Sequence, residues 1–214
     1  MIDNLYHSGA NHMKILIATT NPGKIREFRD MLGGEKFQWD DLSQHKNLEP
    51  VEETGRTFLQ NACLKATAYA KKFNTHTLAD DSGLEVDALG GSPGVHSARW
   101  AELNKAGKGD ADNNDLLIHQ LDQVADEQRT GRFVCVLALA APDGNIVLTA
   151  RDTVEGKILR EERGENGFGY DPLFMINELG KTTAELEPNE KHQISHRGKA
   201  LRRLRELMEK NKLI

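Results

Sequence analysis

The first motif able to do chemistry combines small polar residues, a glycine and a lysine. The hexapeptide Thr19-Thr20-Asn21-Pro22-Gly23-Lys24 follows the apolar run Ile15–Ala18 and precedes a segment with helical periodicity. Backbone amides where a strand passes into a helix bind phosphate, and a lysine adds a mobile positive charge. The spacing of a Walker loop is absent, and ordinary strand-to-helix turns use the same residue types. The motif indicates either a phosphate site or a plain turn.

Two acidic pairs could supply metal ligands and a general base. The first, in Asp80-Asp81-Ser82-Gly83, follows a short predicted strand over Thr77–Ala79. Because adjacent residues of an extended chain point to opposite faces, we expect only one of the two aspartates to face a given cleft. Such a carboxylate could bind Mg²⁺ or accept a proton from a water that the metal has acidified. The structural alternative is an Asx-turn.

The second acidic pair lies in Glu52-Glu53-Thr54-Gly55, within a polar loop predicted over Asp41–Gly55. In proteins, Mg²⁺ is held by one or two carboxylates together with water and substrate phosphates. Glu52 together with Asp81 would meet that requirement. The alternative interpretation of this segment is a solvated acidic loop.

An aromatic ring is set among glycines in Gly167-Phe168-Gly169-Tyr170-Asp171-Pro172. An aromatic side chain can stack on a nucleobase, and a carboxylate or backbone group beside it can recognise the base edge. The alternative is a glycine-rich turn whose Phe or Tyr packs into the core. The two interpretations are compatible if Phe168 lines a base pocket and Tyr170 is partly buried.

Cationic residues precede an amphipathic C-terminal helix that we expect to begin at Gly198. They are Lys191 and the tripeptide Ser195-His196-Arg197. Lysine and arginine suit phosphate or a purine carbonyl, and a histidine can donate from either ring nitrogen. The alternative is a helix start capped by Ser195 with surface cations around it. Arg99 could approach the same anion, although a structural role is favoured for its segment.

The elements that must position these motifs alternate between strands and helices. Apolar runs and alternating segments predict strands, and apolar residues at helical spacing predict helices. The central hairpin demands antiparallel pairing, so the sequence predicts an α/β fold with a mixed β-sheet and flanking helices. The predicted strands are Lys14–Thr19, Phe37–Asp40, Thr77–Ala79, Leu84–Leu89, Phe133–Ala141, Ile146–Thr149 and Val154–Leu159, and the predicted helices are Lys24–Leu32 (ended by Gly33-Gly34), Thr57–Phe73, Asp112–Val124 and the segment from Gly198.

Composition narrows the function class. The net charge of −5 over 214 residues, from 33 acidic and 28 basic side chains, argues against a broad nucleic-acid surface. No apolar run approaches the roughly 20 residues that a membrane-spanning helix needs. Cys63 and Cys135 lie in apolar contexts without a C-x-x-C pair, so we expect buried, reduced thiols in a cytoplasmic protein. Met1–His12 lacks the features of a secretory signal. We expect residues 1–12 to be a disordered extension and residues 13–214 to form one domain.

Taken together and in order, the motifs resemble the inosine triphosphate pyrophosphatase (Ham1-like) family. The resemblance covers the chain from Met13 to the final helix. It rests on Thr19-Thr20-Asn21-x-x-Lys24, Glu52-Glu53-Thr54-Gly55, Ala79-Asp80-Asp81-Ser82-Gly83-Leu84, Gly94-x-x-Ser97-Ala98-Arg99, Phe168-Gly169-Tyr170-Asp171-Pro172 and Ser195-His196-Arg197.

This resemblance implies an elongated, two-lobed α/β fold with a central active-site cleft, usually assembled as a homodimer. It implies Mg²⁺-dependent cleavage of dITP, ITP or XTP to the monophosphate and pyrophosphate. By motif, Asp81 would be the proton acceptor and a metal ligand, with Glu52 as a second ligand. Substrate contacts would fall on Thr19, Thr20, Asn21, Pro22, Gly23, Lys24, Ser82, Phe168, Gly169, Tyr170, Asp171, Lys191, His196 and Arg197.

Three other functions compete with this one. A Maf-like pyrophosphatase acting on dTTP or UTP is disfavoured by the Phe168–Asp171 and Ser195–Arg197 motifs. A binding-only protein would be expected to lose the set Lys24, Glu52 and Asp81 rather than retain it. A phosphotransferase has support from the first loop alone. The partners expected are therefore a purine nucleoside triphosphate and Mg²⁺, without nucleic acid or membrane.

Overall fold

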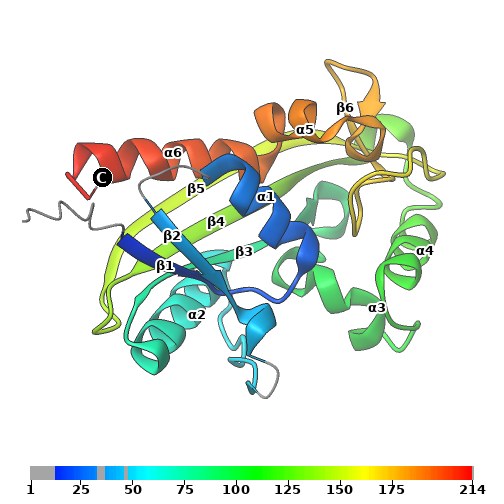
Figure 1. Cartoon of the computed structure of the whole chain (residues 1–214). Coiled ribbons are helices and arrows are strands. Elements are labelled where there is room, and N and C mark those ends of the chain that lie inside the picture. Colours follow the sequence, from blue (N-terminus) through cyan, green and yellow to red (C-terminus); the bar gives the residue numbers. More distant parts are fainter. Residues whose placement is uncertain (1–12, 33–36, 46–47, 214) are drawn as a thin grey trace, which may run out of the picture.

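A seven-stranded mixed sheet runs the length of the molecule in the computed structural model, which describes residues 13–32, 37–45 and 48–213 (Figure 1). The strand order is β2-β1-β3-β4-β5-β6-β7, with β1 parallel to β2 and β3 and the other pairs antiparallel. This confirms the predicted mixed α/β fold. The strands are β1 (Met13–Ile17), β2 (Phe37–Asp41), β3 (His76–Val86), β4 (Thr130–Ala140), β5 (Ile146–Ile158), β6 (Phe174–Ile176) and β7 (Lys181–Thr182).

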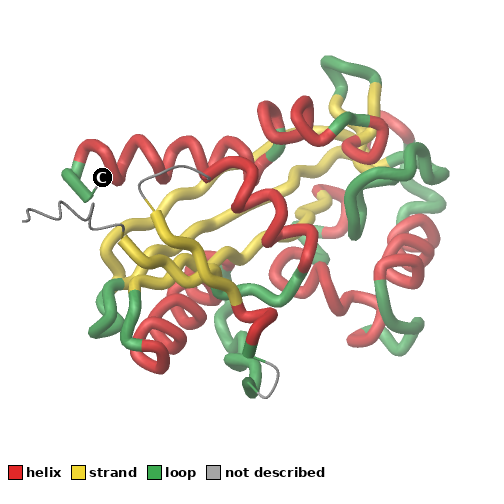
Figure 2. The backbone as a smooth tube through the Cα atoms, viewed as in Figure 1, coloured by secondary structure: helices red, strands yellow, loops and turns green. Residues whose placement is uncertain are grey.

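Helices cover both faces of the sheet and one of its ends (Figure 2). Two of them, α1 and α6, pack on one face, and α2 packs on the other. The short helices α3 and α4 lie at the end of the sheet away from β1 and β2 (Figure 1). The bounds are α1 (Pro22–Leu32), α2 (Phe58–Phe73), α3 (Trp100–Leu103), α4 (Asp110–Gln120), α5 (Pro188–Ile194) and α6 (His196–Lys210).

The two faces of the sheet carry separate hydrophobic clusters because side chains alternate along each strand. On β3, Leu78 packs with the α1 and α6 side chains, whereas the next residue, Ala79, packs with α2. The side of α2 that meets the sheet presents Ala62, Ala66 and Ala70, all fully buried. These small residues bring the helix close to the strands. The same alternation decides where the polar residues that follow on β3 will point.

The predicted hairpin and the helix predicted over Thr57–Phe73 are confirmed. β4 and β5 form the predicted hairpin around Ala141–Asn145. Thr57 caps α2, because its side chain accepts a hydrogen bond from the amide of Gln60. The Gln60 side chain accepts from the amide of Arg56 rather than from that of the capping residue.

The prediction of two short strands around Asp80–Gly83 is wrong. A single strand, β3, runs through this motif. The reason is its partner: β4 pairs with β3 without interruption from Thr77 to Val86. A continuous antiparallel ladder satisfies the backbone of the polar residues, so they do not end the strand. In the same way, Val154–Leu159 is mostly the last part of the long strand β5 and not a separate strand.

Other elements were missed or shifted. The short strands β6 and β7 and the helix α5 were not predicted, and α4 covers Asp110–Gln120 rather than Asp112–Val124. The expected extension over residues 1–12 and the helix stop at Gly33-Gly34 lie outside the described residues. Cys135 is buried as expected, but Cys63 is only partly buried, and both are free thiols.

The core on the α6 face allows a stability test. Leu204 of α6 is fully buried against the sheet, whereas Leu179 has about half of its surface exposed, at 48%. Leu204→Ala should lower the free energy of unfolding by about 2 to 5 kcal/mol, because it removes transfer energy and leaves a cavity. Leu179→Ala should change it by less than about 0.5 kcal/mol. Urea unfolding followed by circular dichroism measures both, and equal losses would contradict this assignment of the core.

Candidate active site

The candidate site lies at the edge of β3, just beyond the point where β1 stops pairing with it. β1 pairs with β3 only at His76–Leu78. Asp80 and Asp81 come two and three residues later, on opposite faces of the sheet. Asp80 contacts side chains of α1 and α6, and Asp81 contacts those of α2. The prediction that only one aspartate faces a given side of the sheet is confirmed.

The first motif forms the start of α1. The Asn21 side chain accepts a hydrogen bond from the Lys24 amide at 3.1 Å, and Thr19 Oγ1 accepts one from the Asn21 amide at 3.2 Å. Pro22 occupies the first helical position, where its missing amide costs nothing. The turn therefore aims the positive end of the α1 dipole and the Lys24 ammonium at the β3 edge.

Asp80 is a buried, ionised anchor for two cations. Lys24 Nζ lies 3.0 and 3.1 Å from its two carboxylate oxygens, and Arg197 reaches it at 3.3 Å. Burial alone would raise the pKa of Asp80, but Lys24 and Arg197 together hold that pKa well below its usual range. The carboxylate therefore keeps its charge at all physiological pH values.

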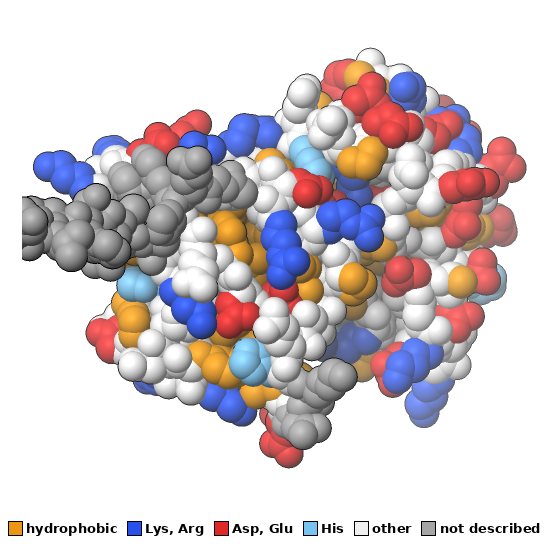
Figure 3. Space-filling model, viewed as in Figure 1, with side chains coloured by type: hydrophobic (Ala, Val, Ile, Leu, Met, Phe, Trp, Pro, Cys, Tyr) orange, Lys and Arg blue, Asp and Glu red, His pale blue; other side chains and the backbone are white. Residues whose placement is uncertain are grey.

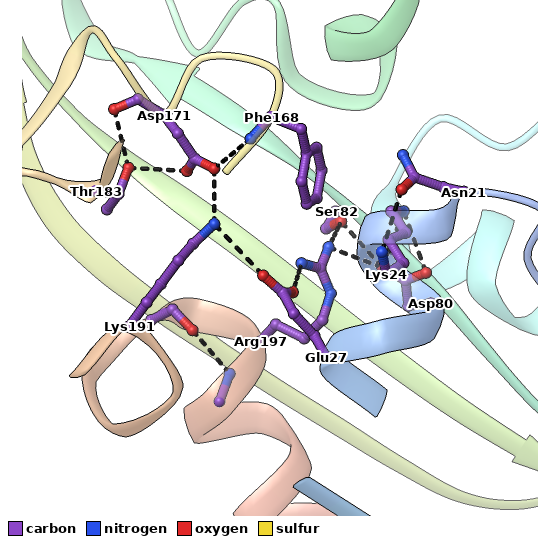
Figure 4. Close-up of polar contacts among 12 residues, drawn as sticks. Asn21, Lys24, Glu27, Asp80, Ser82, Phe168, Asp171, Thr183, Lys191 and Arg197 are labelled. Atoms are coloured by element: carbon purple, nitrogen blue, oxygen red, sulfur yellow. Dashed lines mark hydrogen bonds and ion pairs between the residues drawn. The ribbon is translucent and has the colours of Figure 1, made fainter. Parts of the chain in front are cut away.

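A chain of buried ion pairs extends from Asp80 across the α1–α6 face (Figure 4). The Arg197 guanidinium binds Glu27 of α1 and also donates to Ser82 Oγ at 2.8 Å. Glu27 in turn lies 3.4 Å from Lys191 Nζ, and Lys191 donates to Asp171 at 2.6 Å. Burial would raise the pKa of Glu27, yet Arg197 and Lys191 lower it below the ordinary value. The network joins α1, α5, α6 and the Phe168–Asp171 loop.

The aromatic motif folds over this network. Asp171 accepts a hydrogen bond from the Phe168 amide at 2.8 Å, which closes the turn. The Phe168 ring centroid lies 5.2 Å from Lys191 Nζ and 5.7 Å from the Arg197 guanidinium carbon, within cation–π range. A methyl group at Gly23 would come within 2.8 Å of this ring. The glycine is therefore required for the ring to lie against the start of α1.

Four predicted site residues lie in positions different from those expected. Tyr170 is fully buried rather than partly so, and its hydroxyl donates to the Ser97 carbonyl at 3.0 Å. His196 and Arg197 do not precede the C-terminal helix, because Ser195 caps α6 by accepting from the Gly198 amide and both residues lie in its first turn. The cap places their side chains toward the sheet. Lys191 likewise belongs to a helix, α5.

His196 is a buried, neutral imidazole. Its ring stacks on Phe133 with centroids 4.8 Å apart, and burial followed by the charges of Arg197 and Lys191 pushes its pKa well below the ordinary value. Within the described part of the chain, its Nδ1 atom has no hydrogen-bond partner. A buried polar atom without a partner carries a free-energy cost that a ligand can remove.

These side chains line one pocket. Other walls come from Asp110 and Asn113 of α4 and from Ser97 and Ala98. Of the predicted site residues, the pocket is lined by Asn21, Lys24, Ser82, Phe168, Gly169, Tyr170, Asp171, Lys191, His196 and Arg197. Those placed elsewhere are Thr19, Thr20, Pro22 and Gly23 in the first turn, and Glu52 and Asp81.

Asp81 faces α2 and a second set of partners. Asn61 donates to its Oδ2 atom at 3.0 Å, and Lys65 Nζ lies 3.6 Å from Oδ1. Lys65 also binds Glu53 at 2.6 Å. Burial raises the pKa of Asp81 to about 6, with a further increase from Glu53 and opposing effects from Lys65 and Asn61. The carboxylate is thus the more easily protonated of the two aspartates.

Glu52, the predicted metal ligand, has an exposed side chain and makes no hydrogen bond or ion pair within residues 13–32, 37–45 and 48–213. Glu53 is the residue that shares Lys65 with Asp81. In the same ranges, no group of three or more His, Cys, Asp or Glu side chains is arranged to hold a metal ion. Any metal here would need ligands from a substrate or water in addition to these carboxylates.

Sequence reasoning missed Glu27, Asn61 and Lys65. The sequence contains an indication of each of them. Glu27 follows Lys24 by about one helical turn on α1, so the two side chains share a face of that helix. Asn61 and Lys65 are four residues apart on α2 and stand beside the buried alanines Ala62 and Ala66. A polar residue at the margin of a buried helix face points to a polar partner on the sheet.

The surface gives two further observations. On the face shown in Figure 3, basic and acidic side chains are interspersed, and those drawn in colour form no continuous basic band. No helix in the described ranges is long and apolar enough to span a membrane.

The ion-pair network predicts how stability depends on pH. Glu27→Gln removes the buried negative charge that pairs with Arg197 and Lys191. The variant should lower the free energy of unfolding by about 3 kcal/mol at pH 7, which corresponds to a decrease of roughly 6 to 12 °C in Tm. The folded-state pKa of Glu27 lies below its ordinary value of 4.5. Its stabilising charge is therefore fully effective above that pH and is lost as the pH falls through the folded-state pKa.

Thermal unfolding at pH 7 and at pH 3 to 4 measures this effect. The Tm difference between wild type and Glu27→Gln should narrow in acid. Glu206→Gln, at an exposed position of α6, is the control and should match wild type at both pH values. A difference that stays constant down to pH 3 would show that the Glu27 charge does not stabilise the fold.

Comparison with known proteins agrees with the resemblance seen in the motifs. A model of the Ham1 family matches residues 15–207. A protein named dITP/XTP pyrophosphatase from an Exiguobacterium species is 52% identical over 192 residues, which cover 90% of this chain and 95% of that protein. The solved structure of the Staphylococcus aureus Ham1 protein matches this chain with a TM-score of 0.80 at 41% sequence identity. The structure of a HAM1 protein from Coxiella burnetii matches it with a TM-score of 0.82 at 38% identity. Each match covers 92% of this chain and 99% of the other chain. The fold, the ordered motifs and these matches together show that the chain belongs to the Ham1 family.

Proposed function

We propose that this chain hydrolyses non-standard purine nucleoside triphosphates, namely dITP, ITP and XTP, to the monophosphate and pyrophosphate. The observation that carries the proposal is the convergence of Lys24, Lys191, Arg197 and the neutral His196 on one pocket, whose wall includes Ser82, the residue that follows Asp81 on β3. Support also comes from the relatives named dITP/XTP pyrophosphatase, which match along nearly their whole length. The activity would remove these nucleotides from the cytoplasmic pool.

The cations of the pocket suit a polyphosphate. Lys24 is the most accessible of the three, with 17% of its side chain exposed. Asp80, Glu27 and Asp171 hold the cations in fixed geometry before a ligand arrives. Such preorganised charges stabilise a phosphoryl transition state without reorganising during the reaction. Because the same carboxylates offset much of the positive charge, the triphosphate needs an additional cation.

Mg²⁺ fits the residues at Asp81. The Lys65 ammonium lies near both Glu53 and Asp81, which supports a cation between these carboxylates, and carboxylate oxygens are the ligands that Mg²⁺ prefers. We propose that Asp81 holds the ion together with a carboxylate of the Glu52-Glu53 pair. Glu53 is already on this side, whereas Glu52 would have to turn inward. When bound, Mg²⁺ would neutralise phosphate charge and acidify a water molecule.

Asp81 is the proposed proton acceptor. Its carboxylate lies beside Glu53 and Lys65 on the α2 side of β3, and a carboxylate there can accept the proton of a water held by the metal. Asp80, on the opposite face and tied to two cations, has a pKa held too low for this role. The two adjacent aspartates would therefore divide the work, with Asp80 fixing the phosphate-binding cations and Asp81 accepting the proton.

Discrimination against adenine would rest on hydrogen-bond donors at the base. Inosine and xanthine carry a 6-oxo group where adenine carries an amine. His196 and Arg197 are donors in the pocket, and the Phe168 ring beside them offers a stacking surface. A donor aimed at the 6-oxo group would be left without a partner by adenine, which is costly in a buried site.

We also propose that the chain forms a homodimer, as the family resemblance implies. Light scattering after size-exclusion chromatography tests this oligomeric state.

The function is tested by pyrophosphate release from dITP, XTP, dGTP and dATP, each with Mg²⁺ and with a chelator. Fast release confined to dITP and XTP and abolished by the chelator is the expected result. Release from dATP at a comparable rate would contradict the proposed selectivity. If none of the four is cleaved, pyrimidine triphosphates are screened next, because their cleavage would favour the Maf-like alternative.

Replacing the proposed base should remove catalysis but not binding. Asp81→Asn should lower kcat for dITP by roughly 10²- to 10⁴-fold, because the amide cannot accept the proton. Binding of a non-hydrolysable triphosphate, followed by calorimetry, should remain measurable. Asp115→Asn, at an exposed position of α4, is the matched control. Turnover at the wild-type rate in Asp81→Asn would exclude Asp81 as the base.

Removing the His196 imidazole should weaken the discrimination between hypoxanthine and adenine nucleotides. In His196→Ala the ratio of kcat/KM for dITP over dATP should fall by about tenfold, the equivalent of one lost hydrogen bond to the 6-oxo group. The exposed His119→Ala serves as the control. An unchanged ratio would assign base recognition to other groups of the pocket.

A further inference from the structure

One stripe of α2 holds the loop that carries Glu52 and Glu53. Asn61, Lys65 and Tyr69 are spaced four residues apart, so they share one side of the helix. Asn61 accepts a hydrogen bond from the Gly55 amide at 2.8 Å, Lys65 binds Glu53 at 2.6 Å, and the Tyr69 hydroxyl accepts from the Val51 amide at 3.2 Å. The loop is thereby fixed at three points along the helix.

Asn61 differs from Tyr69 in making a second contact on the β3 side. Its side chain is completely buried. The Oδ1 atom accepts from the Gly55 amide, while Nδ2 donates to Asp81 Oδ2 at 3.0 Å. These partners permit only one orientation of the amide. If the amide were flipped, Oδ1 would face the Asp81 carboxylate and Nδ2 would face the Gly55 N–H, so acceptor would meet acceptor and donor would meet donor. A single side chain thus joins the acidic loop to the proposed base.

The site is closely packed around this amide. A methyl group on Gly55 would lie 2.5 Å from Asn61 Oδ1, so only glycine leaves the oxygen in place. On the other side, the Asp81 carboxylate has one oxygen toward Asn61 and the other toward Lys65. The hydrogen bond from Asn61 therefore fixes the rotation of the carboxylate and keeps Oδ1 directed toward Lys65.

We propose that Asn61 is a positioning residue for Asp81, and that its amide sets the orientation of this carboxylate relative to the loop of Glu52 and Glu53. The inference rests on the proposed function, in which Asp81 accepts the proton. Misplacing a reacting group by about 1 Å costs on the order of 10²-fold in rate. Asn61 is not among the residues that line the pocket, and its contact with the proposed base is the hydrogen bond to Asp81 Oδ2.

The alternative role of Asn61 is only to anchor the loop, and Asn61→Asp separates the two roles. An aspartate of the same shape keeps the acceptor for the Gly55 amide but puts a carboxylate oxygen in place of the N–H toward Asp81, so the two carboxylates repel and Asp81 turns from its present orientation. We expect kcat for dITP to fall roughly 10- to 100-fold, with KM within about threefold of wild type. Asn61→Leu, which removes both hydrogen bonds, should lower kcat at least as much.

Two variants on the same helix serve as controls. Tyr69→Phe removes the anchor at Val51 without touching Asp81, and Gln60→Ala removes the bond to the Arg56 amide. Both should keep kcat within about twofold of wild type. Wild-type kcat in Asn61→Asp would overturn the proposal. An equal loss of kcat in Tyr69→Phe would also overturn it, because loop anchoring would then explain the effect.

A second measurement does not depend on turnover. In a double-mutant cycle of Asn61→Leu and Asp81→Ala, thermal unfolding should show a combined Tm change clearly different from the sum of the single changes. Additive changes would show that the two side chains are not coupled and would overturn the proposal. If wild type cleaves no triphosphate while the cycle shows coupling, the proposed function fails and the Asn61–Asp81 contact stands.

Discussion

The buried guanidinium of Arg197 is the interaction on which the site depends. A charge removed from water is tolerated only when its partners are also held in place. Arg197 meets Glu27 of α1, Asp80 and Ser82 of β3, and it extends from the first turn of α6. Moving any one of these elements would leave a buried charge unpaired. The electrostatics of one side chain therefore fix the register of two helices against the sheet.

The arrangement gives two neighbouring carboxylates different chemistry. Asp80 and Asp81 have the same ordinary pKa, but the alternation of the strand sends them to opposite faces. One meets two cations, and its pKa falls. The other is buried beside Glu53, whose effect and that of burial outweigh those of Lys65 and Asn61, and its pKa rises to about 6. Both aspartates lie beyond the last residue of β3 that pairs with β1.

The sequence predicted the class of fold, the central hairpin and most of the pocket lining, because each depends on local patterns. The features that were not predicted depend on contacts between residues far apart in the sequence. Nothing local indicates that β4 would carry β3 straight through Asp80–Gly83. A helix cap at Ser195 was one of two interpretations of its motif, and the fold shows that this cap places His196 inside the helix. Glu27, Asn61 and Lys65 were missed for the same reason. Each resembles a surface residue until the partner that buries it, Arg197 or Asp81, is brought close by the fold.

The pocket has walls from both ends of the chain. Arg197, one of its lining residues, pairs with Glu27, which lies 170 residues earlier in the sequence. Contacts between such distant segments carry the full loop-closure cost and form late in folding. During synthesis, which proceeds from the N-terminus, α1 and β3 are complete long before α6 leaves the ribosome. Lys24 and Glu27 then lack their partner, so a nascent chain cannot have a formed nucleotide pocket until its last helix has been made.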